Sequence, residues 1–161
     1  MINRISRRYV GYTFVIDGYS KNELSENNDD LEIIKDENFV FEVLGHIDSG
    51  INITSTVGKS FSYKLNELNG AQLVVGPIGS GGVLSNWLLN ISAICFGPES
   101  YYSWTARDSD SLVWKPREPI VYYPINRIRF YENGNYSINM DILFEMIVEI
   151  LNSKITKPDK I

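Results

Sequence analysis

The chain has 161 residues, of which 43% are hydrophobic, and it carries 15 basic against 20 acidic side chains. This length suits one domain with its own core, and the apolar fraction is too high for a chain that is disordered throughout. A single cysteine excludes an internal disulfide, and one cysteine with one histidine argues against a structural zinc site. No apolar run reaches the roughly 18 residues that a membrane-spanning helix needs.

The first residues lack the apolar stretch and the small-residue cleavage site of a signal peptide. We therefore expect a cytoplasmic protein without a membrane partner.

The acidic charge is concentrated in one part of the chain. Residues 17–48 hold ten acids and two bases, a net charge of -8, whereas residues 1–16 carry +3 and residues 49–161 are neutral overall. Such a block repels phosphates, which argues against nucleic acid as the ligand, and it attracts a basic partner. A solvated acidic loop that only aids solubility is the alternative interpretation.

The first half of the chain is rich in predicted strands. β-Branched and aromatic residues predict strands at 8–17, 39–47, 51–57, 60–65 and 71–75. The polar segment 19–38 is expected to be an acidic loop, and Gly58-Lys59 is expected to join two of the strands in a hairpin.

The second half contains the clearest signals. Asn133-Gly134 lies between 126–132 and 135–139, which predicts a hairpin. A helix is expected from Asn139 or Asp141 to about Lys154, because its polar residues recur at helical spacing and the rest is apolar. Residues 156–161 are expected to form a frayed tail. The apolar run 83–96 favours a buried helix, but a strand fits it equally well.

Together these elements predict an α+β fold in a single globular domain, residues 1–161. We expect a mainly antiparallel sheet with the C-terminal helix packed on one face, and one interpretation adds a second helix at 83–96.

Familiar catalytic motifs are incomplete. Gly58-Lys59-Ser60 resembles the end of a phosphate-binding loop, but Ile53 stands where that loop requires glycine. A small hydrolase or transferase is a second hypothesis, with His46 as base beside Asp48. It would need Ser80 or Cys95 brought to His46 by the fold, and nothing in the sequence indicates this. We therefore predict no catalytic residue, no metal and no cofactor.

An aromatic segment follows the apolar run. It contains Trp104 and Trp114 among several tyrosines and prolines. Core packing explains some of these rings, and others could be anchors of a protein interface, where Tyr and Trp are enriched.

The acidic stretch Glu23 to Asp48, the α+β pattern and the lack of a catalytic motif resemble the immunity proteins of bacterial toxins, in particular those of contact-dependent growth inhibition systems. This resemblance implies a cytosolic inhibitor that binds one cognate toxin domain, such as a basic nuclease. The residues expected to bind that partner are acids in the charged block and two aromatic anchors: Asp29, Asp30, Glu32, Asp36, Glu37, Trp104 and Trp114. The oligomeric state stays open. A third hypothesis is a structural or assembly subunit with 83–96 in an oligomer interface.

Overall fold

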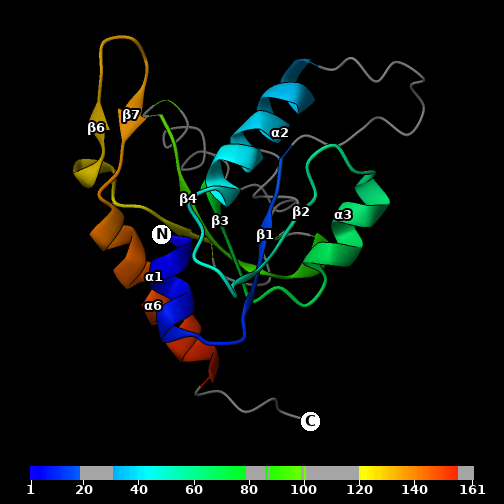
Figure 1. Ribbon diagram of the computed structural model, residues 1–161. Coiled ribbons are helices and arrows are strands. Elements are labelled where there is room, and N and C mark those ends of the chain that lie inside the picture. The colour runs from blue at the N-terminus through cyan, green and yellow to red at the C-terminus, as the bar shows by residue number, and fades with distance from the viewer. Residues whose placement is uncertain (19–30, 79–85, 87, 99, 101–119, 156–161) are drawn as a thin grey trace. The chain divides into compact units, whose positions relative to one another are not determined.

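The computed structural model describes residues 1–18, 31–78, 86, 88–98, 100 and 120–155. The chain divides into two compact units, Met1–Asn69 and Gly70–Ile161, which we describe in turn (Figure 1).

The first unit is built on a pair of parallel strands. Its elements are α1 (Ile2–Arg8), β1 (Thr13–Ile16), α2 (Leu31–Leu44), β2 (Asn52–Ser55) and α3 (Phe61–Leu68). β1 and β2 pair in parallel from Thr13 opposite Asn52 to Ile16 opposite Ser55. Parallel neighbours need a long crossover connection, and α2 lies within the segment that connects them.

Several predictions for this unit are wrong. Residues 39–47 are not a strand, since α2 includes Phe39 to Leu44, and residues 31–38 of the expected loop belong to the same helix. Segment 60–65 is not the second strand of a hairpin, because α3 begins there; the hydroxyl of Ser60 caps it by accepting from the Tyr63 N–H at 3.2 Å. In 8–17, only Thr13–Ile16 is a strand, and Arg8 ends α1.

The second unit has a three-stranded parallel sheet. Its strands are β3 (Leu73–Pro77), β4 (Ser92–Phe96) and β5 (Ile120–Tyr122), in the order β3-β4-β5. β4 is central and buried from Ser92 to Cys95. Ile78, Ala93 and Cys95 form a small core against which two partly buried side chains, Val74 and Ile120, pack.

The predicted hairpin and C-terminal helix are confirmed. A short 3-10 turn (Ile125–Arg127) leads to β6 (Arg129–Phe130), which pairs antiparallel with β7 (Tyr136–Ser137). Gly134, in the turn between them, has a φ of 78°, the left-handed conformation that favours glycine.

Helix α6 (Met140–Ile155) begins after Asn139, whose side-chain oxygen accepts from the Asp141 N–H at 2.8 Å. Leu143, Ile147 and Leu151 form its buried face, and α6 contacts β3. Its predicted polar stripe is exposed, as expected: Asp141, Glu145, Glu149 and Asn152.

The α+β fold therefore holds, but the expectation of a mainly antiparallel sheet is wrong. Among the described strands, only β6 and β7 pair antiparallel. Within 83–96, Ser92–Phe96 is a strand, and the helical residues described before it are Asn86, Leu88 and Leu89.

The single-domain prediction stays a prediction, and the tail 156–161 lies outside the described residues. In the part of the chain that the structure describes, no helix combines the length and apolar character needed to span a membrane.

Replacing Ile147 by Ala should lower the free energy of unfolding by about 2–4 kcal/mol, because the side chain is 2% exposed and its loss leaves a cavity under α6. Ile155, which is 61% exposed in the same helix, provides the matched control. Ile155→Ala should cost less than about 1 kcal/mol. Urea unfolding measures both changes, and equal losses would contradict the packing described for α6.

Candidate functional site

The sequence-predicted acids divide into described and undescribed residues. Asp36 and Glu37 lie in the middle of α2, Asp36 half-buried and Glu37 exposed. Glu32 is in the first turn of α2, but its side chain is not described. The other predicted partner-binding residues lie outside the described part of the chain: Asp29, Asp30, Trp104 and Trp114.

Two glycines allow α2 to come close to the ends of β1 and β2. Because these strands are parallel, their carboxyl ends lie at the same edge of the sheet. Gly18 follows β1, and a Cβ on it would overlap the carboxylate of Asp36 and lie 2.8 Å from Cγ2 of Val57. Gly58 follows β2 with a φ of +67°, and a Cβ there would lie 2.8 Å from Oε1 of Glu37. The carboxylates of α2 thus lie against backbone that has no side chain.

A polar network closes the same edge of the sheet. The Thr56 hydroxyl donates to Oδ1 of Asp17 at 2.6 Å, and Nζ of Lys64 lies 2.9 Å from the same oxygen. Lys64 also donates to the carbonyl of Gly18. Thr56 is fully buried, and the Lys64 side chain is only 13% exposed. Lys64 therefore connects α3 to the end of β1, and the network holds this edge together.

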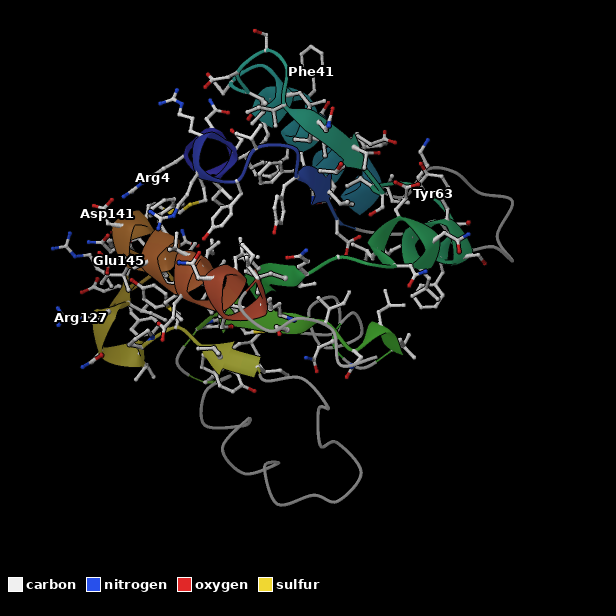
Figure 2. The ribbon with its side chains drawn as sticks, turned by 90° about the horizontal axis from the view of Figure 1, so that it is seen from below. Arg4, Phe41, Tyr63, Arg127, Asp141 and Glu145 are labelled. Carbon is white, nitrogen blue, oxygen red and sulfur yellow. The ribbon has the colours of Figure 1, made fainter. Side chains whose placement is uncertain are left out.

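The outer side of α2 is unusually apolar. Phe39 is 61% exposed but lies two positions from Phe41, on another side of the helix. Leu31 is 70% exposed, Ile34 44%, Phe41 79% and Leu44 43%. We call these four residues the outer stripe. Figure 2 shows Phe41 projecting away from the strands. Single exposed apolar residues are ordinary, but several on one helix face are typical of an interaction surface.

The same helix is acidic. Residues 31–44 contain four acids and one base, Lys35. Glu37 and Glu42 are exposed beside the outer stripe. The outer stripe can be desolvated by a partner, and the negative electric field of the neighbouring carboxylates attracts cations.

Asp48 has a structural role in this unit. Its Oδ2 accepts from the Arg7 guanidinium at 2.8 Å, and its Oδ1 accepts from the Asn3 side-chain amide at 2.9 Å. Asn3 also donates to the carbonyl of His46 at 3.0 Å. These contacts tie α1 to the segment after α2. They give Asp48 two partners other than the His46 ring, which is the partner that the hydrolase hypothesis requires.

Of the two candidate nucleophiles, the structure describes Cys95, and its placement is less favourable than that hypothesis needs. Cys95 is buried in β4, and desolvation raises the pKa of its thiol from 9.0 to about 11, so the reactive thiolate is disfavoured at neutral pH. Ser80 lies outside the described residues. Among the described side chains, no group of three or more His, Cys, Asp or Glu could hold a metal ion.

No protein-family model, no curated protein and no solved structure matches this chain. The geometry described above is therefore the basis for any proposal about function.

The sequence predicts the acids as partner-binding residues but not the outer stripe. A strand is predicted at 39–47, although no helical register can bury every apolar residue of 31–44. This excess of apolar residues was the feature of the sequence that could have indicated an exposed apolar surface on a helix. Thr56 and Lys64 carried no recognisable motif, since only the fold brings them to Asp17.

Replacing Gly18 by Ala should lower the free energy of unfolding by about 1–3 kcal/mol, because the new methyl overlaps Asp36 and crowds the buried Val57. Gly76 is the control, as a Cβ there meets nothing within 4 Å and its φ is not in the left-handed region. Gly76→Ala should change stability by less than about 0.5 kcal/mol. If denaturant unfolding shows equal effects for both variants, α2 does not pack closely on Gly18.

Cys95 should react slowly with a thiol-specific disulfide reagent in the native protein at pH 7 and rapidly in denaturant. Because the folded form binds the thiol proton more tightly than the unfolded form, this group's contribution to stability should be lost as pH rises from about 9 to 11. Absorbance kinetics measure the reaction, and rapid labelling of the folded chain would contradict the burial of this thiol.

Proposed function

We propose that this chain is an inhibitor of the immunity-protein type, which binds and neutralises a basic toxin domain through the outer side of α2. The observation that supports the proposal most directly is the outer stripe, with its neighbouring acids Glu37 and Glu42. The cytoplasm is the proposed place of action.

The two kinds of side chain have separate tasks in this function. Acidic side chains raise the rate of encounter with a basic surface, and a salt-dependent association rate is the consequence. Desolvation of Phe41 and its apolar neighbours slows dissociation, which is where most differences in affinity arise. A nuclease is a suitable target, because its phosphate-binding surface is basic.

The packing below α2 suits this task. Asp36 and Glu37 lie against the glycines at the strand ends, and Lys64 and Thr56 hold Asp17 beside them. A helix fixed in this way loses little conformational freedom on binding, so less of the interaction energy is lost to ordering. The proposal keeps the remaining predicted residues as partner contacts on the basis of their charge or aromatic ring: Asp29, Asp30, Glu32, Trp104 and Trp114.

The test expresses the protein encoded in the reading frame next to this chain's gene, in cells with and without the chain, and asks first whether that protein is toxic. Phe41→Ala should weaken binding at least tenfold, because it removes the most exposed ring of the outer stripe. Glu42→Lys should mainly slow association and reduce its dependence on salt. Growth protection and surface plasmon resonance measure the two effects.

Val10→Ala is the matched control, since Val10 is also apolar and is 88% exposed but lies outside α2. It should protect as the natural chain does. Full protection by a chain that carries both Phe41→Ala and Glu42→Lys would refute the assignment to α2.

A further inference from the structure

Helix α2 carries apolar residues on more than one side, and among the described residues those of one side are buried. Ile33 and Val40 are buried at 5% and 8% exposure, and they lie seven residues apart on the inner face. Leu31, Ile34 and Phe41 lie on a different side of the helix and are exposed, whereas Leu44, four residues after Val40, lies at the border between the two sides. Burial of Ile33 and Val40 therefore does not account for the exposed apolar residues of the outer stripe.

The spacing of the outer stripe is that of a helix-pairing seam. Leu31, Ile34, Phe41 and Leu44 are separated by three, seven and three residues. Leu31, Ile34 and Phe41 fit the a and d positions of a repeat of seven, with Asn38 at the intervening a position and Leu44 beside the seam. A polar residue at one such position is a common device for fixing register. The 14 residues of α2 extend over about 21 Å, enough for two such repeats.

The charged residues beside this seam favour a basic helix as its partner. The charged residues at the flanking positions are two acids, Glu37 and Glu42, and one base, Lys35, so a second copy of this chain would bring together two seams that are each net acidic. Like charges beside an apolar seam oppose pairing, whereas Lys or Arg at the flanking positions of a partner would face Glu37 and Glu42. The chain as a whole has a net charge of -5, which adds to the same preference.

We propose that the outer stripe binds a basic amphipathic helix of the partner, with an apolar seam flanked by Lys or Arg. This inference rests on the proposed function, because it specifies the element by which a toxin domain would be held. The inference goes beyond the proposed function because it names a helix, rather than a loop or a sheet edge, as the bound element.

The experiment uses three synthetic peptides of three heptads and the full chain. The first has Leu at the a and d positions and Lys at the e and g positions; the second replaces those Lys residues by Glu; the third has the first peptide's composition in scrambled order. Isothermal titration calorimetry and backbone amide shifts report affinity and location. The first peptide should bind at least tenfold more tightly than either of the others, with shift changes concentrated in residues 31–44.

Phe41→Ala should weaken binding of the first peptide at least tenfold, and Val10→Ala should leave it unchanged. Equal binding of the scrambled peptide would overturn the inference, because charge alone would then explain it. Sedimentation of the chain by itself should show a monomer; a dimer that Phe41→Ala dissociates would mean that a second copy covers the stripe, which also overturns it.

The outcomes separate this inference from the proposed function. If the lysine peptide binds at α2 but the toxin domain is not neutralised, the helix-binding seam stands and the inhibitor function fails. If the toxin domain is neutralised but the peptide neither binds at α2 nor responds to Phe41→Ala, the inhibitor function stands and this inference fails.

Discussion

The close approach of α2 to the carboxyl ends of β1 and β2 is the constraint on which the rest of the account depends. Gly18 and Gly58 have no side chains, so the carboxylates of Asp36 and Glu37 can lie against their backbone. Lys64 and Thr56 fix Asp17 at the same edge. With its inner face held there, α2 must direct its other apolar residues to solvent. The same packing that stabilises the first unit therefore creates the exposed surface to which we assign function.

The distribution of polar and apolar residues explains which elements could be predicted. In α6 the polar residues form one stripe and the buried residues Leu143, Ile147 and Leu151 lie on the other side, so the helical period is visible. Asn133-Gly134 likewise marks a turn through local geometry alone. In α2 the apolar residues of the outer stripe fill positions that are normally polar, and the helical period is lost. A helix whose apolar residues are partly buried and partly exposed therefore lacks the usual helical pattern in its sequence.

The parallel direction of the strands was not predicted, because helical segments were predicted to be strands. With strands predicted at 39–47 and 60–65, short turns would join antiparallel neighbours, whereas α2 and α3 each follow one strand and precede the next. The acidic character of the candidate site was visible in composition, but its apolar part was not, because exposure depends on which face the sheet covers. The contacts of Asp48 with Arg7 and Asn3 could not be predicted from the sequence either, because they join residues more than 40 positions apart.

The central claim is that the outer side of α2 is the surface by which this chain acts. Hydrogen–deuterium exchange of the full chain, with and without a basic toxin domain that the chain neutralises in a growth assay, is the most direct test. The account predicts slower exchange in residues 31–44 of the complex, while α6 exchanges as it does in the free chain. Unchanged exchange in α2, with protection elsewhere in the chain, would contradict it.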